Sequence, residues 1–144
     1  MHLDRTFDVM ASSIRWFFVF LLAASAIGKL ADMQGFYAVV KTYVILPDVM
    51  IPVSAWALAI VEMLLAICLA TGVQLIAATR IVIGLHFVYL TWLVIALTRG
   101  LQISNCGCFG TYWPRPLTWL TPIEDLILLA LAIVMWRSLK QKQT

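Results

Sequence analysis

Charged residues are scarce in this sequence. Asp, Glu, Lys and Arg make up only 12% of the 144 residues, whereas 63% are apolar, and that charged share is about half the share of a soluble domain. This balance excludes an ordinary soluble fold. The apolar runs are long enough for membrane spans of about 20 residues each, so the composition indicates an integral membrane protein with a single domain over residues 1–144.

Basic residues are also few, and they are not clustered. Ten Lys and Arg against seven Asp and Glu leave a formal net charge of +3, and the basic residues are scattered along the chain. A nucleic-acid partner would require a basic patch on one face, so we exclude nucleic acid. We interpret the basic residues instead as determinants of membrane topology.

Cysteine and histidine are too few for two further classes of protein. Three cysteines cannot build a disulfide scaffold. A metal site needs three or four ligands, but Cys106 and Cys108 supply two, and His86 is expected on the order of 15–20 Å from them at 1.5 Å per helical residue. We therefore predict no metal site. Cys68 lies inside an apolar run and is expected to act as a small apolar residue.

Four apolar segments are expected to cross the membrane. They cover about residues 10–30, 52–71, 76–98 and 120–136. The first is expected to be an uncleaved signal anchor, because its apolar run is longer than many signal-peptide cores. The predicted fold class is therefore all-α, an integral membrane bundle of four transmembrane helices.

The segment after the first span is more polar. Its apolar residues recur at spacings of three and four, which predicts a short amphipathic helix with one apolar face; they are Phe36, Val39, Val40, Tyr43 and Val44. We expect this helix to lie in the membrane interface, with Tyr37 and Tyr43 as anchors.

Polar side chains inside the spans are candidate functional residues. Glu62 lies near the middle of the second span, where an unpaired charge costs roughly 2.5–3.5 kcal/mol. Lys29 could pair with it from the outer end of the first span, or Arg80 from the other side. Two hypotheses stay open for Glu62: an ion pair that fixes helix packing, or a proton acceptor for quinone-linked thiol oxidation. His86 is interpreted as a hydrogen-bonded core residue.

The distribution of basic residues predicts the topology. With four spans, both termini share a side with the turn after the second span, and that side carries Arg5, Arg15, Arg80, Arg137, Lys140 and Lys142. The other side carries Lys29, Lys41, Arg99 and Arg115. The positive-inside rule then places the termini in the cytoplasm and the loop at 99–118 outside. In a bacterium this loop would face the periplasm, where disulfides persist.

The loop at 99–118 contains the most distinctive motif, Cys106-Gly107-Cys108. Such a pair can close a small ring that is expected to be strained, and strained disulfides are oxidising and exchange readily. We predict a catalytic pair in a candidate thiol–disulfide oxidoreductase. The alternative is a non-catalytic assembly factor or accessory subunit in which the same cysteines form a structural bridge. The motif leaves open the direction of electron flow and which cysteine attacks.

Several motifs together resemble one family. Gly28-Lys29-Leu30, the stretch from Tyr43 to Pro47, Glu62, and the stretch from Cys106 to Gly110 resemble the MauE family, within the DoxX-like four-helix membrane proteins. The resemblance implies a bacterial inner-membrane protein that supports disulfide formation or maturation of periplasmic proteins, as in methylamine dehydrogenase biogenesis. It implies as partners a thioredoxin-like periplasmic protein and a cysteine-containing client, besides membrane lipid. No cofactor is required, and a quinone is a candidate.

Overall fold

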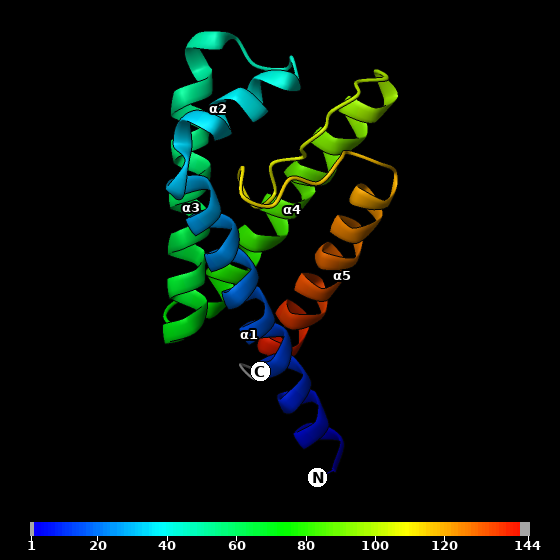
Figure 1. The fold of residues 1–144 in the computed structure, drawn as a ribbon. Coiled ribbons are helices and arrows are strands. Elements are labelled where there is room, and N and C mark those ends of the chain that lie inside the picture. The colour runs from blue at the N-terminus through cyan, green and yellow to red at the C-terminus, as the bar shows by residue number, and fades with distance from the viewer. Residues whose placement is uncertain (1, 142–144) are drawn as a thin grey trace.

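The computed structural model describes residues 2–141, with side chains from residue 9 onward, and this part of the chain is helical without strands (Figure 1). Its elements are α1 (His2–Ala31), α2 (Met33–Thr42), the 3₁₀ turn η1 (Asp48–Met50), α3 (Ile51–Thr71), α4 (Leu75–Thr98) and α5 (Leu120–Gln141). Four long helices with one short helix after the first confirm the predicted fold class. α1 begins at His2, whereas the first span was expected to begin at about residue 10.

Three helical segments within residues 2–141 are long and apolar enough to cross a membrane: Val9–Ala31, Asp48–Thr71 and Leu75–Thr98. α5 has 22 residues, a length of about 33 Å at 1.5 Å per residue. It carries Glu124 and Asp125 near its start and Arg137 near its end, so its composition sets it apart from the other three. That α5 is the fourth span stays a prediction.

The four long helices alternate in direction and form two pairs, α1 with α3 and α4 with α5 (Figure 1). The start of α1 and the end of α5 lie at the same end of the bundle as the turn between α3 and α4. At this end Arg15 donates to the carbonyls of Leu69 (2.6 Å) and Ala70 (3.0 Å), which caps the last turn of α3. Gly72 ends that helix in the left-handed region, at φ 81°.

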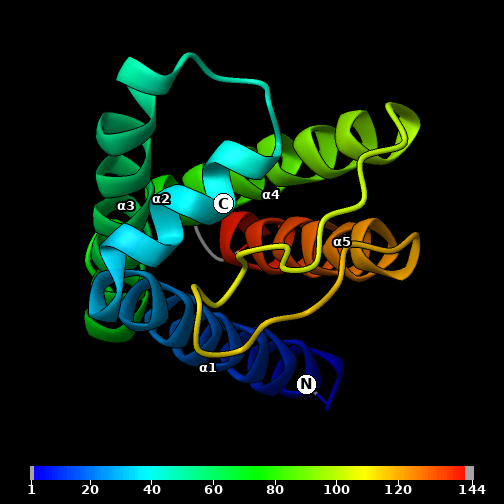
Figure 2. The ribbon, with the colours of Figure 1, turned by 45° about the horizontal axis from the view of Figure 1, so that its top comes forward.

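The two halves of the bundle are filled differently. Near the α3–α4 turn, buried side chains of all four long helices pack together, among them Phe18, Leu69, Val82 and Met135. At the opposite end the helices spread apart, and α2 and the cysteine loop lie between them (Figure 2). The core there contains Phe36, Val39 and Tyr43 with Leu93 and Cys106.

The apolar face of α2 turns toward the protein. Phe36 and Val39 are buried against the cysteine loop and α3. The prediction that Tyr43 anchors the chain in the interface is wrong, because its ring is buried and its hydroxyl donates to the carbonyl of Cys106 at 2.7 Å. Periodicity identified the apolar face correctly, but a face that packs on protein and a face that enters lipid have the same pattern.

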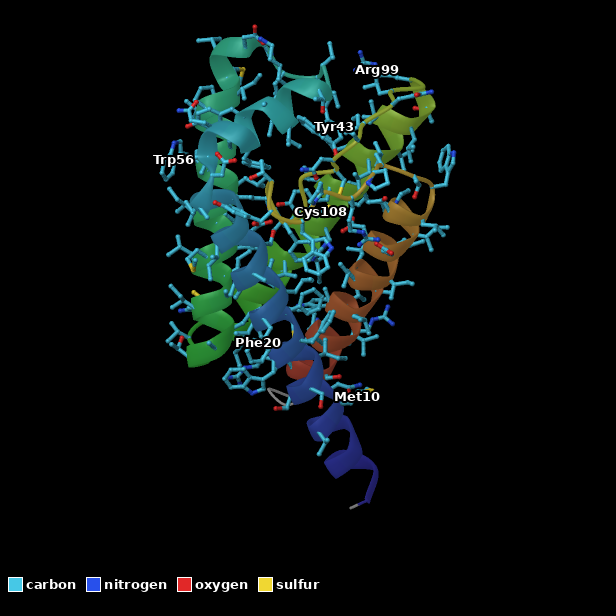
Figure 3. The ribbon with its side chains drawn as sticks, viewed as in Figure 1. Met10, Phe20, Tyr43, Trp56, Arg99 and Cys108 are labelled. Carbon is cyan, nitrogen blue, oxygen red and sulfur yellow. The ribbon has the colours of Figure 1, made fainter. Side chains whose placement is uncertain are left out.

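The cysteine loop enters the bundle, although it was expected at or outside the membrane surface. Its backbone lies against α1 at Gly28, where an added Cβ would be 2.3 Å from the carbonyl oxygen of Phe109. A Cβ added to Gly110, whose φ is 70°, would lie 2.2 Å from the carbonyl oxygen of Gly28. Figure 3 accordingly shows Cys108 between the two helix pairs. Two glycines make this approach of backbone to backbone possible.

Replacing Gly28 by alanine should destabilise the protein, by about 1–3 kcal/mol for an overpacked contact. Gly84→Ala is the matched control, since Gly84 also lies within a helix but has no atom within 4 Å of an added Cβ. Both changes gain the same helix propensity, so the difference in melting temperature in detergent isolates the loop contact. Equal melting temperatures for the two variants would contradict the seating of the loop on α1.

Candidate thiol–disulfide site

The two cysteines of the loop lie side by side as free thiols. Their Sγ atoms are 3.1 Å apart, and neither Cys106 nor Cys108 is in a disulfide. Gly107 between them has φ 78°, and an added Cβ would lie 2.7 Å from Val39. Asn105 closes the turn, because its side chain accepts from the Gly107 amide at 3.0 Å and donates to the Gly110 carbonyl at 3.1 Å.

Hydrogen bonds from other residues fix the backbone carbonyls of both cysteines without a disulfide bond. Tyr43 donates to the carbonyl of Cys106, and Ser25 donates to the carbonyl of Cys108 at 2.6 Å. The amide of Cys106 donates to the Arg115 carbonyl at 2.8 Å. The position of the pair therefore does not depend on a bond between the sulfurs, which leaves that bond free to form and break.

The two thiols have different acidities. The hydrogen bond from the Cys108 thiol lowers the pKa of Cys106 to about 6, with support from backbone amides and Arg115 and against the effect of burial. The same hydrogen bond raises the pKa of Cys108 well above its usual value, and so do the protein atoms that surround this thiol where it faces the space between the helices. Cys106 is therefore the more acidic thiol of the pair.

The thiols also differ in access. Cys106 is 8% exposed, whereas Cys108 is exposed. Both line a cavity of about 610 Å³ that lies between α1, α3, α4, α5 and the loop. Three of the four predicted polar candidates line the same cavity, namely Lys29, Glu62 and His86. Arg80 does not; it is exposed, and its guanidinium lies 5.9 Å from the centre of the Trp136 ring.

Lys29 is the partner of Glu62. Its ammonium lies 2.7 and 2.6 Å from the two carboxylate oxygens, and both side chains are at least 98% buried. The hydroxyl of Tyr89 also donates to Glu62. Ser25 accepts from Lys29 at 2.6 Å and lies 2.9 Å from Glu62, and it is the residue that holds the Cys108 carbonyl. The ion pair is thus connected to the cysteine loop through one hydroxyl.

His86 lines the same cavity as the two thiols. The estimate of 15–20 Å between His86 and the cysteines assumed a loop outside the bundle, whereas the loop enters the bundle. The Nδ1 atom of His86 lies 2.7 Å from Asp125 Oδ1, and both residues are buried. This pair links α4 to α5 and gives the acidic residue at the start of α5 a structural partner.

Sequence reasoning missed three residues of this site: Ser25, Tyr89 and Asp125. Two of them carried a signal, since residues three or four apart share a helix face. Ser25 lies four residues before Lys29, and Tyr89 lies three residues after His86. The pairing of Asp125 with His86 left no local signal, because it depends on how α4 and α5 pack.

Cys68 lies apart from the pair. It packs against the core cluster at the other end of the bundle, with Leu69 and Val82. Among the side chains that the structure describes, those of residues 9–141, no three from His, Cys, Asp or Glu gather in an arrangement that could hold a metal ion.

Comparison with known proteins identifies the family. The family described as "Methylamine utilisation protein MauE" matches residues 7–138. This chain belongs to the MauE family. The methylamine utilization protein MauE of Paracoccus denitrificans is 33% identical over 84% of this chain, and that of Methylorubrum extorquens is 30% identical over 78%. These matches span 65% and 60% of the two relatives. No solved structure matches the chain.

With its membrane-spanning helices, this MauE-family chain is a multi-pass membrane protein.

Replacing Lys29 should lower the free energy of unfolding markedly. Lys29→Met leaves the Glu62 carboxylate buried without a counter-charge, and breaking a buried pair costs about 3–5 kcal/mol. Lys41→Met is the matched control, because Lys41 and its partner Asp48 are largely exposed and such pairs contribute less than about 1 kcal/mol. Unfolding in detergent would measure both. Adding Glu62→Gln to Lys29→Met should restore part of the loss, and equal losses for the Lys29 and Lys41 variants would contradict the assignment.

One thiol should ionise near pH 6. The depressed pKa of Cys106 means that its thiolate is present above about pH 6 and is lost as the pH falls below it. The ultraviolet absorbance of thiolates, followed against pH in reduced Cys68→Ala protein, measures this transition. Cys106→Ser should abolish it. Ionisation of all thiols only near the ordinary value, about 8.5, would contradict the geometry of the pair.

Proposed function

We propose that this chain is a membrane thiol–disulfide exchange protein whose reactive pair is Cys106 and Cys108. The observation that carries the proposal is the pair of free sulfurs 3.1 Å apart, with Cys108 exposed at a cavity. A small closure of that distance allows a bond of about 2.05 Å. The family's link to methylamine utilisation suggests that the pair serves the maturation of a cysteine-containing periplasmic client in that setting.

The difference between the two thiols assigns their roles. A client thiolate attacks Sγ of Cys108 in the oxidised pair, because that sulfur is the accessible one. The bond between the two cysteines breaks, and Cys106 leaves as a thiolate, which its low pKa favours. The second client thiolate then attacks the client sulfur bound to Cys108, which breaks the mixed disulfide and releases Cys108, and Cys108 takes up a proton. The client dithiol becomes a disulfide and gives up two electrons and two protons. The pair gains both electrons and one or two of the protons, depending on pH, and any remaining proton passes to water.

A redox role explains the pair better than a structural bridge does. The loop is already held by Ser25, Tyr43, Asn105 and the backbone contact at Gly28. A bridge across one intervening residue would add little to a turn that is fixed at both carbonyls. What the pair does provide is a thiol and a thiolate in contact, at a surface that a partner sulfur can reach.

The pair needs a partner to regenerate it. Of the three cysteines, Cys68 lies at the other end of the bundle and cannot serve as a second relay. We propose a periplasmic thioredoxin-like protein as the exchange partner. The six-to-four distribution of basic residues supports an inner-membrane orientation with cytoplasmic termini and a periplasmic loop. Exposed Tyr112 and Trp113 within the loop, and Trp119 directly after it, suit the aqueous edge of the membrane.

Single cysteine variants should trap partners unequally. In a Cys68→Ala background, Cys106→Ser should form a stable mixed disulfide through Cys108, because nothing remains to resolve it. Cys108→Ser should form little, since Cys106 is buried. Glutathione disulfide as the probe in detergent, and non-reducing gels of membranes from cells, would measure the adducts.

Two outcomes would overturn the proposal. Capture by neither variant, with both still supporting methylamine-dependent growth, would favour a structural bridge in an assembly factor. Capture mainly by Cys106 in the Cys108→Ser variant would reverse the assigned roles of the two thiols.

A further inference from the structure

The cavity beside Cys108 has the properties of a small-molecule site. Its volume of about 610 Å³ falls within the range of roughly 300–1,000 Å³ that is typical of ligand pockets. Most of its wall is apolar, from side chains such as Leu21, Leu58, Trp92 and Leu128. Polar side chains line the rest of the wall, and one of them is the exposed thiol of Cys108.

The cavity has two chemically different edges. Arg115 and Glu124 line it and are half-exposed, forming an ion pair at 2.8 Å. Val88 and Ile127 also line it, and these apolar side chains are 54% and 56% exposed on helices α4 and α5. Exposed apolar side chains on long membrane helices face lipid. A ligand dissolved in the membrane could therefore reach the cavity past Val88 and Ile127, while a protein partner approaches at the polar edge.

Hydrogen-bonding groups lie at the cavity wall beside the thiol. The hydroxyl of Tyr89 donates to Glu62, and both residues line the cavity. His86 lines it as well and is 3% exposed. Asp125 holds its Nδ1 atom, whereas Nε2 has no hydrogen-bond partner among the described residues. These are groups that could hold a ligand oxygen or take up a proton.

The reduced pair needs an electron acceptor. Each disulfide formed in a client reduces the pair by two electrons, and Cys68 lies too far away to accept them. An acceptor that reaches the pair from the membrane must combine three properties: solubility in the membrane, a ring small enough for the cavity, and oxygens that accept hydrogen bonds. A quinone combines them.

Resting on the proposed function, we propose that this cavity binds the ring of a lipid-soluble quinone, which oxidises the reduced pair. Above about pH 6 the thiolate of Cys106 and the thiol of Cys108 lose two electrons and one proton as the bond between them forms. The quinone takes up both electrons, that proton and a second proton from water, and leaves as the quinol. The polar edge then serves protein thiols, and the apolar edge serves the quinone.

Filling the cavity tests this proposal. Leu58→Trp places a larger ring in the cavity from α3, and Leu64→Trp is the matched control, because Leu64 is 55% exposed on the same helix. Full-length protein in nanodiscs would be reduced and mixed with decylubiquinone, whose reduction is followed by its absorbance. We expect Leu58→Trp to lower the rate about tenfold or more, because the added ring occupies ligand volume. Leu64→Trp should behave like the parent chain.

A second measurement covers the case in which Leu58→Trp fails to fold. In Cys68→Ala, Cys106→Ser protein, which cannot be oxidised to the internal disulfide, bound decylubiquinone should protect Cys108 from alkylation by a maleimide. The protection should saturate with quinone concentration and should be absent with a saturated alkane of the same tail length. Equal protection by the alkane would mean that the cavity takes up acyl chains, and would overturn the proposal.

The outcomes separate this inference from the function beneath it. Exchange with glutathione disulfide, without quinone reduction or protection of Cys108, would overturn the quinone site and leave the exchange function standing. Loss of both activities in the parent chain would overturn the exchange function itself. Equal rates of quinone reduction in the two tryptophan variants would place the reaction outside this cavity.

Discussion

The buried ion pair between Lys29 and Glu62 is the interaction on which the rest of the site depends. Two charges inside membrane-spanning helices are tolerated only when they neutralise each other and fill their hydrogen bonds. Here the carboxylate of α3 meets the ammonium of α1 and the hydroxyl of Tyr89 on α4, so one side chain joins three helices. Ser25 extends this contact to the carbonyl of Cys108. The ion pair that the two buried charges require therefore also helps to position Cys108, through Ser25.

The second constraint is the divergence of the helices at the end where the loop lies. Helices that spread apart leave volume that α2 and the cysteine loop fill only in part, and the remainder is the cavity. The loop can enter because Gly28 and Gly110 let two backbones touch. The loop thus places its cysteines beside a largely apolar space instead of in open water, with the sulfur of Cys108 exposed there and Cys106 buried.

Cys106 and Cys108 differ in exposure and in thiol pKa, although the motif itself is symmetrical. The two residues are identical in chemistry and separated by one glycine, yet one is buried with a depressed pKa and the other is exposed with a raised pKa. Disulfide exchange benefits from this inequality, since an accessible sulfur is attacked and a stabilised thiolate leaves. The hydrogen bond between the two thiols is the main cause of the difference in their pKa values.

Local patterns in the residues were sufficient for the class of protein, the positions of α3 and α4, the apolar face of α2 and the family. Apolar runs, helical periodicity and short motifs are properties of neighbouring residues, so they can be recognised without a fold. Three features could not be recognised in this way: the choice of Lys29 over Arg80 as the partner of Glu62, the inward turn of Tyr43, and the pairing of His86 with Asp125. Each depends on contacts between residues 27 or more positions apart. Only the packing of the helices, and the close approach of the loop to Gly28, brings those residues together.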